Sequence, residues 1–342
     1  MCGPRRTAWL AGVLVLCAGA LGFGAPGARA AAQYPPGLSE QGKRGFDAYR
    51  LLGFNKAFAV AGDGRWFYLW SQSRKPADLV AALLGDCNKK TQTPCTVVSL
   101  NDHEVQGGDP LAIPTSEGPA LAPLVPAPYY PIQGPQRASG ILIWSHGVLP
   151  GDDNTRFPPQ GWVNRFRDQG YDIYKFDRRW PDYNADLSRL RQAVGAARET
   201  GYRHVILAGQ SVGAWMSLEA AARGAPVDGV LAAAPARFGD YLGSQSRQQN
   251  RDVLVPVIEA LTQRDLNAVV MFFSGDPFDP GGRSERVRDV LAHAVRARTL
   301  LIDGAVGVSG HAGAASARFV TDYGECLRDF VLDGKREKPC GD

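Results

Sequence analysis

Three side chains in the second half of the chain have the types and the order needed for nucleophilic attack on an acyl carbon. Ser211 lies in Gly209-Gln210-Ser211-Val212-Gly213, between an apolar strand-like run at 205–208 and a helix-like segment at 214–222. A tight turn from strand to helix needs small flanking residues, and its strain directs the serine hydroxyl outward. In a chain with 40 glycines the pattern alone is weakly specific. It becomes informative only if an acid and a histidine follow the serine.

The histidines can be tested by elimination, because the chain has only five. Four precede the serine or lie within a charged helical segment: His103, His146, His204 and His293. His311 remains, in the small-residue loop 307–313 that follows an expected strand at 299–302. A neutral imidazole in such a loop can accept the serine proton near pH 7. We therefore expect His311 to be the general base.

Two carboxylates are candidates for the group that orients His311. Asp276 comes directly off the expected strand at 268–273 and is followed by proline, whereas Asp279 lies deeper in the same loop. Asp276 is favoured, with Asp279 as the alternative and Asp240 as a weaker third candidate. The acid that is not used would be a turn or capping residue.

Two backbone N–H groups are expected to stabilise the oxyanion. Val212 follows the serine at the start of a helix, where N–H groups lack partners. Val148 follows Ser145-His146-Gly147 after the expected strand at 140–144. His146 itself is expected to have a structural role, bonding the loop backbone.

These motifs together resemble those of secreted bacterial serine α/β-hydrolases, over residues 136–342. The motifs that carry the resemblance are Trp144-Ser145-His146-Gly147, Gly209-Gln210-Ser211-Val212-Gly213, Asp276-Pro277 and Gly310-His311-Ala312-Gly313. The chain is similar in compactness to the dienelactone-hydrolase-like branch, but Ser211 stands where dienelactone hydrolases have cysteine. The resemblance therefore implies an esterase-like activity, and the departure at Ser211 counts against a lactone substrate.

The elements that must position these residues alternate between strand and helix, which predicts a mainly parallel sheet with helices on both faces. Strands are expected near 140–144, 171–176, 205–208, 229–233, 269–273 and 299–302, with a possible edge strand at 121–130. Helices are expected near 162–169, 185–200, 214–222, 253–261, 284–294 and 315–332. Residues 33–107 are interpreted as a small α+β module of unknown role, 108–135 as a Pro/Gly-rich linker, and 136–342 as the hydrolase domain.

The N-terminus and the cysteines predict export. Residues 1–30 have a basic start, an apolar segment and the small-x-small end Ala28-Arg29-Ala30, which is typical of a signal peptide. Four cysteines follow it, and their local spacing predicts Cys87–Cys95 and Cys326–Cys340 disulfides. A secreted or periplasmic protein is expected. Its net charge falls from +4 to +1 when the three arginines of residues 1–30 are removed, which gives no electrostatic reason to expect nucleic acid or an anionic membrane as a partner.

The sequence therefore predicts an exported serine hydrolase that cleaves an ester or related acyl bond in a small-molecule or acyl substrate. No integral membrane association is expected after signal cleavage, and no cofactor or metal, since no Cys/His spacing suits zinc. Two alternatives stay open, a non-catalytic cell-envelope or binding protein on the same fold and a serine peptidase. Six side chains are candidates for shaping a pocket: Tyr68, Trp144, Arg178, Arg179, Trp180 and Trp215. The pair Arg178-Arg179 is interpreted as a surface pair.

Overall fold

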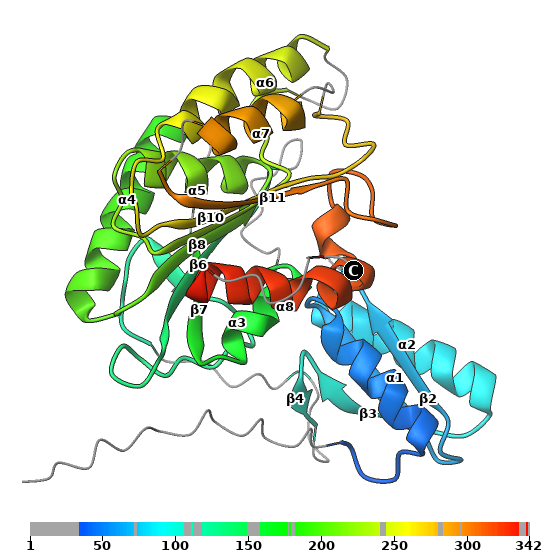
Figure 1. Cartoon of the computed structure of the whole chain (residues 1–342). Helices are drawn as coiled ribbons and strands as arrows, with labels where there is room; N and C mark the ends of the chain where they lie inside the picture. The colour runs from blue at the N-terminus through cyan, green and yellow to red at the C-terminus, as the bar shows by residue number, and fades with distance from the viewer. Residues whose placement is uncertain are drawn as a thin grey trace, which may run out of the picture. The chain divides into compact units, whose positions relative to one another are not determined.

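The computed structural model describes most of the chain after the expected signal peptide (Figure 1). The described residues are 34–71, 74–105, 111, 118–148, 158–176, 178, 182–239, 244–279, 283–293, 296–334 and 340. Pro35–Asp342 form one compact unit, and this unit is described below. The predicted signal peptide, residues 1–30, lies outside the described residues.

A seven-stranded sheet forms the centre of the unit, with the order β11-β10-β9-β8-β6-β7-β5. Its strands are β5 (Leu124–Pro126), β6 (Gly140–Ser145), β7 (Tyr171–Phe176), β8 (Val205–Gln210), β9 (Gly229–Ala233), β10 (Asn267–Phe272) and β11 (Arg298–Asp303). All neighbouring pairs are parallel except β5 and β7, which pair antiparallel at the edge. The expected mainly parallel sheet is confirmed, and β5 is the short edge strand expected within 121–130.

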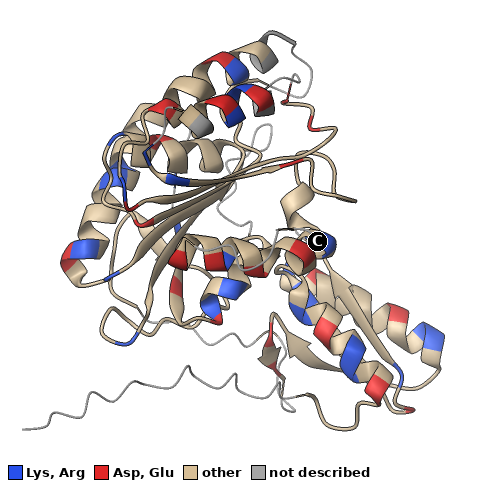
Figure 2. Ribbon diagram, in the orientation of Figure 1, with Lys and Arg blue, Asp and Glu red and all other residues tan. Residues whose placement is uncertain are grey.

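Helices cover both faces of this sheet, because most of its strand residues are apolar on both sides and cannot face water. One face packs against α4 (Tyr183–Thr200), α5 (Val212–Ala222), α6 (Ser244–Glu259) and α7 (Arg283–His293). The other packs against the 3-10 turns η1 (Gly161–Val163) and η2 (Gly313–Ala315) and the helices α3 (Asn164–Arg167) and α8 (Ala317–Asp333). Figure 2 shows charged residues on the flanking helices, while the strands between them carry few.

Two helices differ from their expected extents. α6 begins at Ser244, nine residues before the expected start at 253. Its first half is polar and has no apolar repeat, so the sequence revealed only the half that contains buried Leu254 and Ile258. The helix expected at 162–169 is instead η1 followed by the single turn α3.

A second sheet lies in the N-terminal part of this compact unit. We define this part as residues 39–105 and call it the N-terminal unit. It is antiparallel, in the order β2-β1-β3-β4. The elements are α1 (Glu40–Leu51), β1 (Lys56–Ala61), β2 (Trp66–Trp70), α2 (Pro76–Thr91), β3 (Cys95–Leu100) and β4 (His103–Glu104). The expected α+β module is confirmed as a fold, although α1 was not predicted. Ser39 caps α1 by accepting from the Gly42 N–H, a signal that the sequence offers.

Two aromatic residues of β2, Trp66 and Tyr68, form a stack with Phe58 of β1 on the side of α1. The Trp66 ring stacks on Phe58 with a centroid distance of 5.8 Å and on Tyr68 at 6.2 Å. A side chain at Gly45 would overlap the Trp66 ring, so the helix lies directly on it. Trp66 therefore packs between β1 and α1, whereas Tyr68 is 40% exposed.

Both expected disulfides are present. Cys87–Cys95 joins α2 to the start of β3, with 6.2 Å between the Cα atoms. Cys326–Cys340 ties the C-terminal segment to α8, with 5.6 Å between the Cα atoms. Among the described residues, no helix has the length and apolar character needed to cross a bilayer.

Candidate active site

Ser211 occupies a strained turn between β8 and α5. Its φ and ψ are 57° and −121°, in a region that residues other than glycine rarely adopt. Such a conformation costs about 1–3 kcal/mol and persists only where the surroundings enforce it. Two hydrogen bonds of the serine backbone help to do so: its N–H donates to the Ala233 carbonyl, and its carbonyl accepts from the Trp215 N–H.

The two glycines beside Ser211 are required by contact with backbone. A Cβ at Gly209 would lie 2.5 Å from the carbonyl carbon of Gly213 and 2.7 Å from the carbonyl oxygen of Ser145. A Cβ at Gly213 would overlap the carbonyl groups of Ser145 and His146. The start of α5 therefore packs directly on the chain that leaves β6, which brings the serine turn close to the segment carrying Val148.

His311 lies in the loop after β11, and the structure pairs it with Asp276. Both carboxylate oxygens of Asp276 lie 3.0 Å from Nδ1 of His311. The Asp276 side chain is fully buried, and that of His311 is 9% exposed. Because a carboxylate only accepts, Nδ1 carries the proton, and Nε2 of a neutral ring is the basic nitrogen. Nε2 is buried and has no hydrogen-bond partner among the described residues.

The loops of the acid and the histidine are fixed to each other and to the serine turn. The Gly310 N–H donates to the Ser274 carbonyl at 2.8 Å, and the Gln210 side-chain amide donates to the His311 carbonyl at 3.2 Å. The Phe278 ring covers the imidazole of His311, with 4.5 Å between centroids. The Phe278 N–H also donates to Asp276 Oδ1 at 2.8 Å. The imidazole and the carboxylate are thus held in place from two sides.

Asp279 takes a different place in the loop. Its backbone N–H donates to the Asp276 carbonyl at 3.0 Å, which closes a turn around Asp276. Asp240, the weakest candidate, lies outside the described residues.

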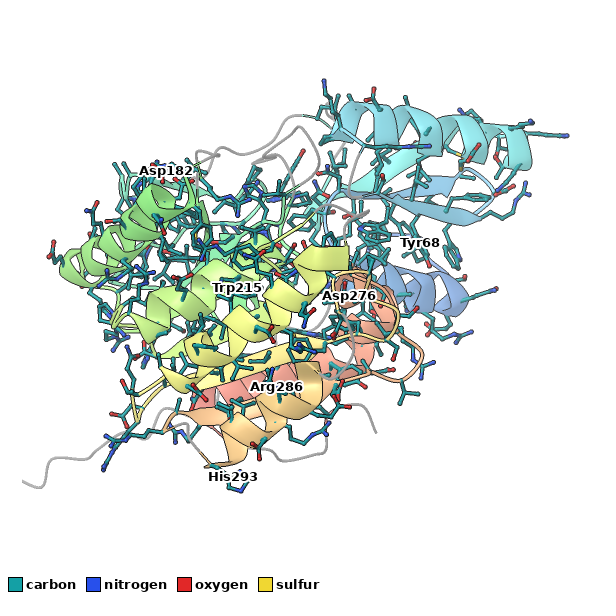
Figure 3. The ribbon with its side chains drawn as sticks, turned by 90° about the horizontal axis from the view of Figure 1, so that it is seen from above. Tyr68, Asp182, Trp215, Asp276, Arg286 and His293 are labelled. Carbon is teal, nitrogen blue, oxygen red and sulfur yellow. A yellow bond between two sulfur atoms is a disulfide. The ribbon has the colours of Figure 1, made fainter. Side chains whose placement is uncertain are left out.

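Three of the other histidines are held elsewhere. His103 contacts the Tyr129 carbonyl, His204 is exposed near Asp228, and His293 contacts the Asp289 carbonyl of its own helix. Figure 3 shows His293 projecting from the periphery of the molecule, away from Asp276.

His146 and Arg178 hold the chain segment between β6 and Val148. His146 Nδ1 lies 2.7 Å from the Gly147 carbonyl oxygen, which requires that Nδ1 donate. Arg178 Nη2 donates to the same oxygen at 3.2 Å. The guanidinium packs 3.4 Å from His146 Nδ1, and the residue is only 3% exposed. The surface interpretation of Arg178 was wrong: the turn after β7 directs it inward, onto the backbone carbonyl.

Of the two expected oxyanion donors, Val148 lines a cavity that also contains Ser211 and His311, and Val212 directly follows Ser211 in the chain. Val212 is the first residue of α5, so its N–H has no partner within the helix. Val148 lines the cavity beside Gly147. The cavity has a volume of about 450 Å³. Its described walls are Trp144, His146, Gly147, Val148, Pro158, Gln160, Gln210, Ser211, Pro277, Phe278, Ser309, Gly310, His311 and Ala312.

The other pocket candidates from the sequence are placed elsewhere. Trp215 is fully buried and packs edge-on against Phe238, with 5.8 Å between centroids. Tyr68 belongs to the N-terminal unit, while Arg179 and Trp180 lie outside the described residues. Sequence reasoning missed Gln160, which precedes η1 and has no motif to mark it. Among the described residues, no cluster of three or more His, Cys, Asp or Glu is placed to hold a metal ion.

The strand order and the serine turn together decide the architecture. Six parallel strands carry one antiparallel edge strand. β7 lies on one side of β6, and the connection from β7 to β8 crosses to the other side. The G-x-S-x-G turn leads from the central β8 into α5, as a nucleophile elbow does. This is the α/β-hydrolase fold. An acid after β10 and a histidine after β11 are the chain order that the fold uses.

The chain matches no protein-family model and no curated protein. Solved structures with similar backbones include the esterase Pf2001 of Pyrococcus furiosus, which is 11% identical, with a TM-score of 0.42 over 57% of this chain and 80% of that one. A puromycin hydrolase variant is 14% identical, with a TM-score of 0.45 over 71% of this chain and 42% of that one. A putative dienelactone hydrolase from Klebsiella pneumoniae is 17% identical, with a TM-score of 0.36 over 52% and 82%. At these TM-scores the fold assignment rests on this chain's own strand order and elbow.

Proposed function

We propose that this α/β-hydrolase-fold protein is a serine hydrolase that cleaves an ester or related acyl bond. His311 Nε2 takes the proton from the Ser211 hydroxyl, and the oxygen attacks the acyl carbon. The N–H groups of Val212 and Val148 stabilise the oxyanion, and Asp276 orients the imidazole and stabilises its charged form. The protonated His311 then gives its proton to the leaving group. In the second half, His311 takes a proton from water, the water oxygen attacks the acyl carbon, and the proton returns to Ser211 Oγ as the acid is released.

The observation that carries this proposal is the shared cavity. Ser211 and His311 line one space, and the carboxylate behind His311 meets Nδ1 with both oxygens. His311 Nε2 has no hydrogen-bond partner in the described part of the chain, so this nitrogen is not occupied by a bond to the protein. Together with the strained φ of Ser211, this favours catalysis over a purely structural role.

We also propose that the protein is exported. The pattern of residues 1–30 and the two disulfides support a secreted or periplasmic location, because disulfides persist in oxidising compartments.

The deciding experiment is labelling of the purified mature protein with a fluorophosphonate, followed by peptide mapping. We expect a single adduct on Ser211 that is lost in Ser211→Ala and reduced at least a hundredfold in rate in His311→Ala. Ser309→Ala is the matched control, because Ser309 lines the same cavity, and it should keep the adduct. A folded protein that forms no adduct would favour a non-catalytic binding role. Hydrolysis of p-nitrophenyl esters but not of chromogenic peptides would separate an esterase from a peptidase.

A further inference from the structure

Gln160 is a buried polar side chain on the wall of the cavity. The residue is 5% exposed and lines the space together with Pro158, Trp144 and Ser211. A buried amide must satisfy its hydrogen-bonding groups or pay their desolvation cost. Which of its atoms faces the cavity decides what it can recognise there.

Trp162 fixes the orientation of this amide. The indole Nε1–H can only donate, and it donates to Gln160 Oε1 at 2.8 Å. The oxygen of the amide is therefore occupied, and the two N–H donors of Nε2 remain. Among the described residues none accepts from Nε2. Trp162 is itself fully buried and packs edge-on against Trp144, with 5.6 Å between centroids, so it cannot swing away.

The backbone beside Gln160 rests on the N-terminal unit. A Cβ at Gly161 would lie 2.8 Å from both the Gly53 nitrogen and the Leu51 carbonyl oxygen. A Cβ at Gly53 would in turn lie 3.1 Å from the Gly161 nitrogen. Two chain segments that are more than 100 residues apart thus meet backbone to backbone, and only glycines permit that approach. The backbone that follows Gln160 therefore rests on the residues at the end of α1.

A buried ion cluster holds the same two parts together. Asp102, after β3, forms an ion pair with Lys56, with 2.8 Å between Oδ1 and Nζ, and its Oδ2 accepts from Arg167 of α3 at 2.9 Å. Beside it, the Tyr130 hydroxyl donates to Asn164 Oδ1 at 2.8 Å. Because α3 directly follows η1, these contacts fix the turn that carries Trp162. The N-terminal unit therefore reaches the cavity wall through α3 and η1.

From this arrangement we infer that Gln160 selects the substrate by donating a hydrogen bond to it, and that the N-terminal unit serves to hold Gln160 in that position. The inference rests on the proposed hydrolase function. The substrate group in the cavity would be an uncharged one that carries an acceptor, such as an ether, carbonyl or hydroxyl oxygen, beside the apolar surfaces of Trp144 and Pro158. Trp162 and Gly161 are positioning residues, whereas Gln160 contacts the substrate.

The test compares esters of equal size with and without an acceptor. One pair, p-nitrophenyl methoxyacetate and butyrate, varies the acyl side, and a second pair, 2-methoxyethyl and butyl acetate, varies the alcohol side. The variant Gln160→Met keeps the length of the side chain and removes the donor. For one of the two pairs, we expect kcat/KM of the oxygen-containing ester to fall about tenfold in Gln160→Met, while that of the alkyl partner changes less than about twofold.

Further variants test the positioning. Trp162→Phe keeps a ring and removes the Nε1 donor, so it should lose part of the same selectivity. Gly161→Ala should lose it as well, because the added methyl separates the two backbones. Gly85→Ala is the matched control within the N-terminal unit, since nothing lies within 4 Å of a Cβ there, and it should leave the selectivity unchanged. Circular dichroism and Ser211 labelling confirm that each variant is folded.

The outcomes separate the two proposals. If the wild type neither labels at Ser211 nor hydrolyses any of the four esters, the hydrolase function fails and this inference fails with it. If the wild type is active and Gln160→Met leaves the ratios of both pairs unchanged, only the role of Gln160 is overturned. If Gln160→Met shifts a ratio but Gly161→Ala, although folded, does not, the role given to the N-terminal unit is overturned.

Discussion

Both carboxylate oxygens of Asp276 are 3.0 Å from Nδ1 of His311, and the carboxylate is fully buried while the imidazole reaches the cavity. This geometry gives the imidazole one fixed tautomer, with the basic nitrogen on the side of the cavity. It also distinguishes Asp276 from Asp279, three residues further along the same loop.

Exchanging each of these two aspartates for asparagine tests that distinction. Asp276→Asn keeps the shape of the side chain, but its amide can donate to Nδ1 and favours the wrong tautomer of His311. We expect kcat to fall by about 10⁴-fold, as in other triads. Asp279→Asn should change kcat less than about threefold. The reverse order of effects in ester hydrolysis would show that Asp279 is the acid.

The elbow glycines should tolerate no methyl group. Gly213→Ala places a Cβ against the Ser145 and His146 carbonyls, so either the turn or the segment after β6 must move. We expect the rate of Ser211 labelling to fall at least a hundredfold, because the serine and the oxyanion donors are displaced together. Gly195→Ala in α4 is the control. Its Cβ would meet nothing within 4 Å, and the exchange should stabilise the helix by about 0.5–1 kcal/mol. Normal labelling of Gly213→Ala would show that the turn is less constrained than the contacts indicate.

Arg178 should affect the rate without contacting the substrate. Arg178→Met removes the donor to the Gly147 carbonyl, so the N–H of Val148 is less well fixed. Loss of one oxyanion donor costs about 10²–10³-fold in kcat, and we expect this indirect effect to be about 10- to 100-fold. KM should change little. The exposed Arg318→Met, which removes a surface pair with Asp322, is the comparison and should leave kcat unchanged. A rise in KM alone would instead indicate that Arg178 binds the substrate.

Lys56 should make folding stability depend on pH in the alkaline range. Burial lowers the pKa of its ammonium from 10.5 to about 8, against the opposing effect of Asp102. Between these values the folded protein has released a proton that the unfolded chain still binds, so stability rises with pH. Below pH 8 both states hold the proton, and the cost of burying the charge is fully present.

Urea unfolding of the wild type and Lys56→Met at pH 8, 9 and 10 measures this effect. The stability of the wild type relative to the variant should increase across this range, by an amount on the order of 1–3 kcal/mol. Taking the difference between the two proteins removes the contributions of other titrating groups. A difference that stays flat or decreases with pH would contradict the assignment.

The sequence alone was sufficient for the architecture and for the candidate nucleophile and base. Apolar strands alternating with helices specify a parallel sheet, and the carboxyl ends of parallel strands meet at one edge. Loops after 208, 273 and 302 must therefore lie near one another, whatever their detailed conformations. Elimination among five histidines then left His311. The N-terminal sheet was harder to predict, because α1 and β1 have short apolar patterns that are not distinctive.

What only the tertiary structure decided depends on contacts between distant segments. Asp276 and Asp279 have similar local sequences, and which of them reaches His311 depends on how the loop turns above β10. Arg178 resembles a surface residue in sequence, yet the turn after β7 buries it against Gly147. Gln160 gains its place from Trp162 and from the approach of Gly161 to Gly53. Local patterns report on backbone conformation and on which face is apolar. They carry no information about which distant backbone will lie against a given residue, because that is set by the packing of the whole unit.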